Sequence, residues 1–200
     1  MNILIIGFGN IGKAHLAGIL KLKKKIKVYV LDKKHINNKF NDSRVEKINK
    51  IPSNFNLDLV IVSTDVKERL IIIKKIIKNK NIIKYLLLEK YLFKNINEFV
   101  EFEKKYLKKI QKDCLVNCWG DILLKSMKVK NKKRVNKITV KIDKSSYLTS
   151  LIHFLQILKN FKKIDNNLKI KLNIEKIINS KRKNYKELVG KIKIYKKDFS

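Results

Sequence analysis

Short apolar runs alternate with amphipathic segments along the first 92 residues of the chain. Continuous apolar runs such as residues 2–8 and 57–64 are typical of strands buried in a parallel sheet. The pattern predicts strands at 2–8, 25–32, 57–64 and 82–90, with helices at 12–22, 66–80 and 95–112. Because parallel strands joined by helical crossovers bring their carboxyl ends to one edge, we expect a doubly wound α/β sheet with a ligand site at that edge.

Two parts of the chain do not follow this alternation. Residues 33–53 are polar and Asn-rich and predict a loop with a short irregular element around RVEKI. Beyond residue 113, the predicted elements are strands at 114–119 and 135–142, helices at 121–130 and 146–161, and strand-like runs at 168–174 and 190–196. We therefore expect an α/β domain over 1–113, followed by a small, incomplete α/β or α+β domain over 114–200.

Three glycines follow the first apolar run in the spacing Gly-x-Gly-x-x-Gly, directly before the first predicted helix. In a dinucleotide site of the Rossmann type, the first permits the turn, the second lets the backbone approach a pyrophosphate, and the third lets helix and sheet pack closely. The helix N-terminus then offers free N–H groups to the phosphates. The predicted cofactor-binding residues here are Gly7, Phe8, Gly9, Asn10, Ile11 and Gly12. The alternative is a glycine-rich turn without a ligand.

Asp32 ends the second predicted strand, at the place where an acid accepts hydrogen bonds from the ribose diol of adenosine. A carboxylate there repels a 2′-phosphate, so the sequence favours NAD over NADP as the cofactor. Lys33 and Lys34 follow directly and weaken that preference. The alternative for Asp32 is a solvated side chain at the end of a strand.

A formal net charge of +32 on 200 residues raises the alternative of a polyanion-binding module. Two observations favour a different interpretation. The basic residues comprise 45 Lys and only 4 Arg, whereas surfaces that read bases or clamp phosphates rely on the planar fork of Arg. Lys, Ile and Asn, whose codons are rich in A and U, make up 97 of the 200 residues. We interpret the charge as mutational drift in an AT-rich genome and expect no specific nucleic-acid partner.

The remaining composition adds little chemistry. Cys114 and Cys118 are the only cysteines and no histidine is near them in sequence, so we expect ordinary buried thiols and no metal site. No apolar stretch reaches the roughly 18–20 residues of a membrane span, and the N-terminus does not resemble a signal peptide. A cytoplasmic protein without a membrane partner is the default expectation.

Four motifs in order resemble the glucose–fructose oxidoreductase and inositol dehydrogenase (Gfo/Idh/MocA) family. GFGNIGKAH at 7–15 resembles its glycine-rich opening, VIVST at 60–64 its third-strand end, LLLEKYL at 86–92 its Glu-Lys-Pro-Leu signature, and SLIHFLQIL at 150–158 its His-x-x-Asp helix. The resemblance implies NAD(P)-dependent oxidation or reduction of a sugar, cyclitol or related hydroxyl or keto compound. It also implies a second domain with an open sheet that mediates homo-oligomers.

The resemblance assigns roles to five residues. Lys90 would contact substrate and assist proton transfer, with Glu89 as its structural neighbour, and His153 would be the catalytic histidine. Ser63 and Thr64 would border the nicotinamide ribose. The chemistry is coherent, because a histidine near neutral pKa can remove a hydroxyl proton and a nearby lysine stabilises developing alkoxide. The alternative for His153 is a histidine packed in the core.

The sequence also departs from the family pattern. Tyr91 replaces the signature proline, Asp65 replaces the proline after Ser-Thr, Gln156 replaces the acid after the histidine, and Thr149 stands where many members carry an acid. The second domain is short: either strands of its sheet are missing, or the chain is a fragment or a decayed gene product. A dinucleotide-binding protein with impaired catalysis is therefore the alternative function.

Overall fold

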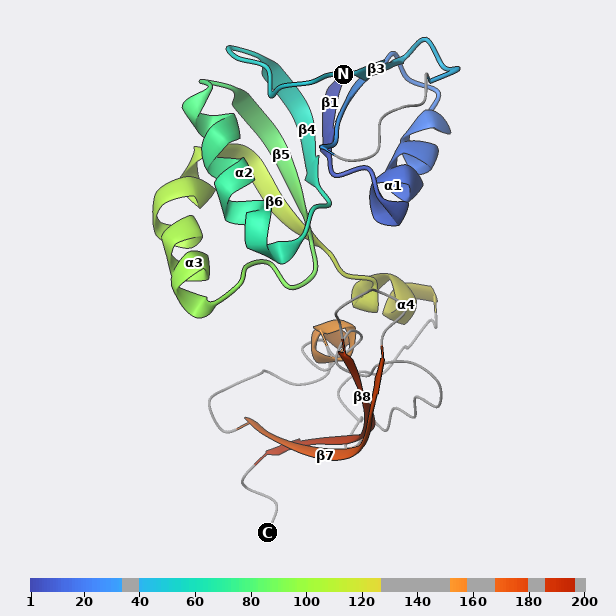
Figure 1. Cartoon of the computed structure of the whole chain (residues 1–200), viewed down its shortest axis with the longest axis vertical. Helices are drawn as coiled ribbons and strands as arrows, with labels where there is room; N and C mark the ends of the chain where they lie inside the picture. The colour runs from blue at the N-terminus through green and yellow to red at the C-terminus, as the bar shows by residue number, and fades with distance from the viewer. Residues whose placement is uncertain (34–39, 127–151, 158–167, 180–185, 197–200) are drawn as a thin grey trace. The chain divides into compact units, whose positions relative to one another are not determined.

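The computed structural model describes residues 1–33, 40–126, 152–157, 168–179 and 186–196, and the chain divides into two compact units, Met1–Asn117 and Cys118–Ser200 (Figure 1). The division falls four residues after the boundary expected at 113/114, which lies inside a strand of the first unit, β6 (Ile110–Asn117). The predicted strand at 114–119 is therefore the end of β6, and Cys118 begins the second unit.

The first unit contains a six-stranded parallel sheet with the order β3-β2-β1-β4-β5-β6. The strand order reverses between β1 and β4, which makes this the point where ligands bind in doubly wound sheets. The predicted α/β fold is confirmed. The strands before β6 are β1 (Asn2–Ile6), β2 (Lys27–Leu31), β3 (Val45–Lys47), β4 (Asn56–Val62) and β5 (Ile82–Glu89). β3 replaces the irregular element expected around RVEKI.

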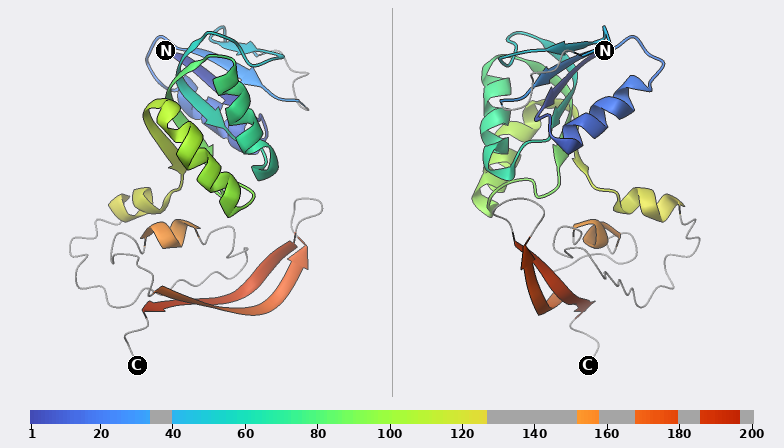
Figure 2. Two further views of the ribbon diagram at one scale, coloured as in Figure 1. Left: turned by 90° about the vertical axis from the view of Figure 1, so that its left-hand side faces the viewer. Right: turned by 45° about the vertical axis from the view of Figure 1, so that its right-hand side comes forward.

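Helices cover both faces of this sheet, with α1 on one face and α2 and α3 on the other (Figure 2). The alternation of strand side chains explains why the central strands are apolar throughout. Ile3 and Ile5 of β1 pack in one core cluster with Leu16 and Ile19 of α1 (Asn10–Leu20). The intervening β1 residues join the cluster that contains α2 (Val66–Lys78) on the opposite face. Both faces are thus buried, as the continuous apolar runs predicted.

The single helix expected over 95–112 was wrong in its length. The segment begins as α3 (Ile96–Glu101), continues as a π-helical turn at Phe102–Tyr106 and a 3-10 turn at Leu107–Lys109, and then enters β6. Ile110 is the first residue of β6, where it is buried and pairs with Ile83 of β5. The strand therefore takes the residues that the helical periodicity had assigned to the last turn.

The second unit is described in part. It contains α4 (Gly120–Ser126), a helical segment at 152–157, and an antiparallel pair of strands, β7 (Leu168–Asn179) and β8 (Lys186–Lys196). α4 begins against the helical segment, since a Cβ at Gly120 would lie 2.5 Å from the carbonyl oxygen of His153. The strand predicted at 135–142 lies outside the described residues. Among the described helices, none is long and apolar enough to cross a membrane.

Candidate functional site

The glycine loop between β1 and α1 is built as the Gly-x-Gly-x-x-Gly spacing predicted. Gly7 has φ +91, a conformation that L side chains rarely adopt, and its N–H donates to the carbonyl of Leu31 at 2.9 Å. A Cβ on Gly12 would lie 2.1 Å from the carbonyl oxygen of Gly7, so only glycine permits this approach of helix to turn. Gly9 differs from both, because a Cβ there would meet nothing within 4 Å. The space that a side chain at Gly9 would occupy is therefore open.

The N-terminus of α1 lacks a capping side chain. Gly9 is its N-cap residue, no side-chain hydrogen bond caps it, and no acid lies in its first turn. By contrast, Asp65 caps α2 by accepting the N–H of Lys67, and Asn95 caps α3 by accepting the N–H of Glu98. An uncapped helix N-terminus beside open space is suited to an anion, because its N–H groups and dipole favour negative charge.

The other residues predicted in this loop have different surroundings. Phe8 is buried and packs edge-to-face on Phe40, with ring centroids 5.3 Å apart, so its side chain belongs to the core. Asn10 and Ile11 are exposed in the first turn of α1. These two residues can contribute their backbone N–H groups to a phosphate.

Asp32 follows β2 and is tied to the glycine loop, since its Oδ2 accepts the backbone N–H of Phe8. This contact brings the predicted ribose-binding carboxylate to the loop that would hold the pyrophosphate. The next residue, Lys33, points its ammonium to Glu68 at 3.4 Å in an exposed ion pair. Lys34 lies outside the described residues.

Ser63 and Thr64 follow β4 and adjoin the glycine loop. The Ser63 hydroxyl donates to the carbonyl of Gly7 at 2.7 Å, and its backbone N–H donates to the carbonyl of Ile6 at 2.8 Å. The Thr64 Oγ1 is buried and has no hydrogen-bond partner among the described residues. Since buried polar atoms are normally paired, this hydroxyl is a candidate partner for a ligand.

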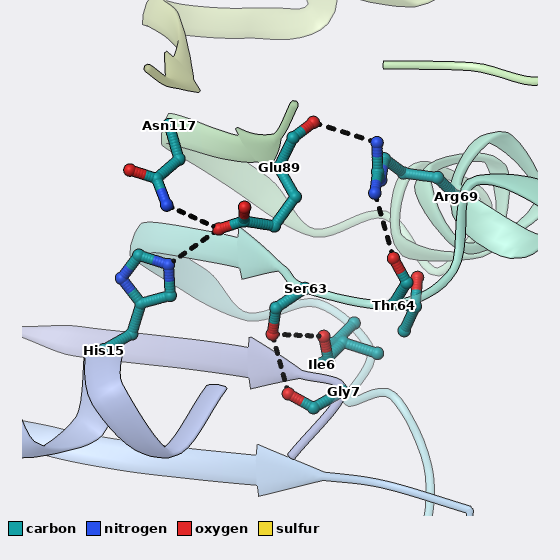
Figure 3. A network of polar contacts seen from close by, with 8 residues as sticks. All are labelled: Ile6, Gly7, His15, Ser63, Thr64, Arg69, Glu89 and Asn117. Atoms are coloured by element: carbon teal, nitrogen blue, oxygen red, sulfur yellow. Dashed lines mark hydrogen bonds and ion pairs between the residues drawn. The ribbon is translucent and has the colours of Figure 1, made fainter. Parts of the chain in front are cut away.

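Glu89 gathers two side chains from distant parts of the sequence at the carboxyl edge of the sheet (Figure 3). Its Oε1 lies 3.0 Å from Nε2 of His15 on α1 and accepts the amide of Asn117, the last residue of β6, at 2.7 Å. His15 and Glu89 are both mostly buried, with side chains 19% and 12% exposed. Neither partnership was predicted from the sequence.

Lys90 and Tyr91 follow Glu89 directly. Lys90 is half-buried, and Tyr91 is exposed with φ +54, in the left-handed region. The described residues contain no cis peptide bond. The loop at the position of the family proline therefore has its own shape. Burial of part of the Tyr91 ring raises the pKa of its hydroxyl.

His153 lies in the second unit and is 2% exposed. Its Nδ1 accepts the backbone N–H of Trp119 at 3.2 Å and lies 3.0 Å from the Sγ of Cys118, while its ring packs on Trp119 with centroids 4.3 Å apart. Cys118 is thus paired with a histidine 35 residues away, which the sequence did not predict. Gln156 is half-buried on the same helical segment, and Thr149 lies outside the described residues.

The structure brings most of the predicted cofactor residues to one edge of the first unit. Six predicted site residues lie at the carboxyl ends of β1, β2, β4 and β5 or directly after these strands: Gly7, Asp32, Ser63, Thr64, Glu89 and Lys90. Gly9 and Gly12 follow in the glycine loop and in the first turn of α1. Sequence reasoning missed Arg69 and Asn117, which bind residues of the same edge. Position gives a signal for Asn117, since it ends β6 at the same edge at which Asp32 directly follows β2. Among the described residues, no group of three or more His, Cys, Asp or Glu is placed to hold a metal.

No protein-family model and no curated protein matches the chain. Solved structures do match it. The yvaA protein of Bacillus subtilis, named as a candidate oxidoreductase, aligns with a TM-score of 0.62 and 12% identity, covering 94% of this chain and 57% of that one. A candidate oxidoreductase from Bacteroides fragilis aligns with a TM-score of 0.60 and 12% identity, covering 87% and 57%.

Scyllo-inositol dehydrogenase from Lactobacillus casei, with bound NAD(H) and scyllo-inositol, aligns with a TM-score of 0.57 and 12% identity, covering 85% of this chain and 58% of that one. The chain thus spans little more than half the length of these structures. At such identities the likeness shows the fold: a doubly wound α/β unit followed by a second unit.

Proposed function

We propose that the chain is an NAD-dependent oxidoreductase that acts on a sugar, a cyclitol or a related hydroxyl or keto compound. One observation carries the cofactor part of the proposal: α1 begins uncapped at Gly9, facing open space, with Asp32 bound to the same loop. The structures of similar fold support the proposal, because their names describe oxidoreductases and one of them holds NAD(H).

In this proposal, the residues of the first unit divide the binding of the cofactor. The backbone N–H groups of the first turn of α1 bind the pyrophosphate, and Asp32 accepts hydrogen bonds from the adenosine ribose. Ser63 and Thr64 border the second ribose. Bound NAD supplies a carbon that accepts or donates hydride. The negative charge of Asp32 disfavours the 2′-phosphate of NADP, so NAD is the preferred form.

Lys90 is the proposed proton-handling residue of the first unit. It follows β5 at the same edge, and an ammonium placed beside a reacting carbonyl oxygen stabilises negative charge there and can donate a proton to it. The resemblance also gives His153 an acid–base role, which the hydrogen bond accepted at its Nδ1 opposes.

A second function, dinucleotide binding with little catalysis, is favoured by the surroundings of His153. A backbone N–H that donates to Nδ1 needs the lone pair of that nitrogen, so the neutral ring carries its proton on Nε2. In this state the ring has no vacant nitrogen at which to accept a substrate proton. The packed-core interpretation of His153 is therefore the stronger one in this arrangement.

The cofactor proposal is tested by titrating the protein with NADH and following nicotinamide fluorescence. Asp32→Ala should weaken NADH binding about tenfold or more and should narrow the preference for NADH over NADPH, since about 1.4 kcal/mol corresponds to a factor of ten. Asp113→Ala, which removes an exposed acid from β6, is the matched control and should leave binding unchanged. Equal NADH affinity in the wild type and in Asp32→Ala would exclude the proposed site.

Catalysis is tested by screening sugars and cyclitols for reduction of NAD. With an active substrate, Lys90→Ala should abolish most turnover, whereas Lys94→Ala, an exposed lysine four residues on, should not. His153→Ala decides between the two functions of that residue. Turnover that survives both Lys90→Ala and His153→Ala would remove both residues from the mechanism. Tight NADH binding without turnover on any substrate would support the second function.

A further inference from the structure

Arg69 is a buried cation that bonds to two loops at the carboxyl edge of the sheet. It lies in the first turns of α2 and is only 3% exposed. Its Nη2 donates to the carbonyl of Thr64 at 2.9 Å, in the loop after β4. Its Nη1 donates to three carbonyls in the loop after β5: Glu89 at 2.9 Å, Tyr91 at 2.5 Å and Leu92 at 3.0 Å. Figure 3 shows the guanidinium between Thr64 and Glu89.

Burial of this guanidinium is energetically unfavourable by itself. Desolvation lowers the pKa of Arg69, partly offset by the charges of Glu89 and Asp65. Its hydrogen bonds within the described residues go to backbone carbonyls rather than to a carboxylate, and its Nε is buried without a hydrogen-bond partner among those residues. A buried cation is costly unless hydrogen bonds compensate for its lost hydration, and here the carbonyls of two loops supply that compensation.

The structure that Arg69 fixes includes a strained residue. Tyr91 has φ +54, and for a bulky side chain this left-handed conformation is uncommon and unfavourable. Arg69 binds the carbonyls on both sides of Lys90, at Glu89 and at Tyr91. The backbone of Lys90 is thus held on both sides by one side chain.

We propose that Arg69 is a positioning residue that holds the loops at 63–64 and 89–92 in place for the nicotinamide half of the cofactor. This inference rests on the proposed function. With the adenosine ribose at Asp32 beyond β2 and the pyrophosphate at the start of α1, the other half of a dinucleotide extends across β4 and β5. Those are the two strands whose following loops Arg69 joins.

The test compares two probes, NADH and ADP, because ADP lacks the nicotinamide half. Arg69→Lys keeps the charge but cannot span four carbonyls with one ammonium. We expect this variant to bind NADH about tenfold more weakly and ADP within about twofold of the wild type, since the phosphate and adenosine contacts lie outside the two loops. The emission of bound NADH should also shift toward that of free NADH.

Two further variants complete the experiment. Arg44→Lys alters another arginine with several acceptors, both oxygens of Asp42 and the carbonyl of Leu20, and should leave both affinities unchanged. Arg69→Gln removes the buried charge but keeps an amide donor, so it replaces Arg69→Lys if that variant does not fold. The same tenfold difference between the two probes is expected for it.

Each outcome bears on a different claim. Wild-type NADH affinity in the folded Arg69 variants would overturn the positioning role while leaving the proposed function intact. Equal weakening of ADP and NADH would also overturn it, because the role would then be general stability of the unit. A wild-type protein that binds neither probe would overturn the proposed function, and this inference with it.

Discussion

Alanine substitutions at Gly9 and Gly12 should separate cofactor binding from folding. Gly9 has φ −71 and ψ −165, a conformation that alanine adopts freely, and its Cβ would meet nothing within 4 Å. Gly12 is enclosed, because its Cβ would lie 2.1 Å from the Gly7 carbonyl oxygen and 3.1 Å from the Ser63 Oγ. One glycine therefore keeps a space open for a ligand, and the other permits the turn itself.

The magnitudes follow from these contacts. The overlap at Gly12 is with a backbone oxygen held by the Ser63 hydroxyl, so relief requires the turn to shift. Because the overlap is with backbone and reaches 2.1 Å, overpacking here should cost about 2–3 kcal/mol, offset by about 1 kcal/mol from the higher helix propensity of alanine. For a unit of 117 residues, a net loss of about 1–2 kcal/mol lowers the unfolding midpoint by roughly 3–10 °C. At Gly9, alanine is a weaker N-cap, which destabilises the folded unit, but it also lowers the conformational entropy of the unfolded chain, which stabilises the folded unit. Because the two effects nearly cancel, the free energy of unfolding should change by less than about 1 kcal/mol.

The assay combines thermal unfolding, followed by circular dichroism, with NADH titration. Gly9→Ala should unfold near the wild-type temperature yet bind NADH at least about tenfold more weakly, because its methyl group stands in front of the α1 N-terminus. Gly12→Ala should unfold at the lower temperature. If Gly9→Ala binds NADH as the wild type does, the open face at Gly9 does not receive the pyrophosphate. If Gly12→Ala is fully stable, the turn is not as tight as its contacts indicate.

Two other substitutions test the structure locally. Tyr91→Pro introduces the proline of the family signature and should destabilise the first unit, because proline fixes φ near −65° and Tyr91 has φ +54. Tyr91→Gly is the control and should be at least as stable as the wild type. A proline variant as stable as the wild type would refute the loop geometry. Burial and the charge of Asp113 raise the pKa of the Cys114 thiol from 9.0 to about 11. Below pH 9.0, the thiolate fraction of Cys114 is therefore about 100-fold lower than that of a free cysteine. In a Cys118→Ser background, Cys114 should therefore react with a thiol reagent about 100-fold more slowly than a free cysteine, and rapid labelling at neutral pH would contradict its burial. The free energy of unfolding should fall as the pH rises from 9.0 through the folded pKa, because only the unfolded thiol ionises readily in that range.

The parts of the site predicted from sequence are those encoded over short distances. The glycines, the strand before them and the helix after them are contiguous, and Asp32 directly follows the next strand. Each of these positions follows from a local pattern plus one rule, that parallel strands present their carboxyl ends at one edge. The edge could therefore be assembled without knowledge of any side-chain contact.

The contacts of Glu89 could not be predicted in the same way. His15 is 74 residues away and Asn117 is 28 residues away, and both reach Glu89 only because α1 and β6 end near β5. A prediction would have needed the strand order as well as the strands. With β6 assigned to the second domain, Asn117 stood on the wrong side of the expected boundary. The error in the domain limit and the missed partner of Glu89 thus have one cause.

Arg69 did leave a signal in the sequence. Arg69, Ile72, Ile73 and Ile76 occupy one face of α2 at helical spacing, and all four are buried. A charged residue at the first position of an apolar stripe indicates either a helix end or a buried cation with partners. The periodicity alone could not distinguish the two cases, because the partners are backbone carbonyls of other loops, which no side-chain pattern records.

The arginines also clarify the meaning of the large positive charge. Among the side chains of Lys, Arg, Asp and Glu in the described residues, only that of Arg69 is buried. Arg44 and Arg69 each bind at least three acceptors, a geometry that a planar guanidinium fork satisfies and a single ammonium does not. Arginine therefore suits positions where one side chain must span several acceptors. By the same reasoning, Lys90 is distinguished from the other lysines by its place after β5 and not by its charge, so variants of Lys90 and Lys94 test position rather than composition.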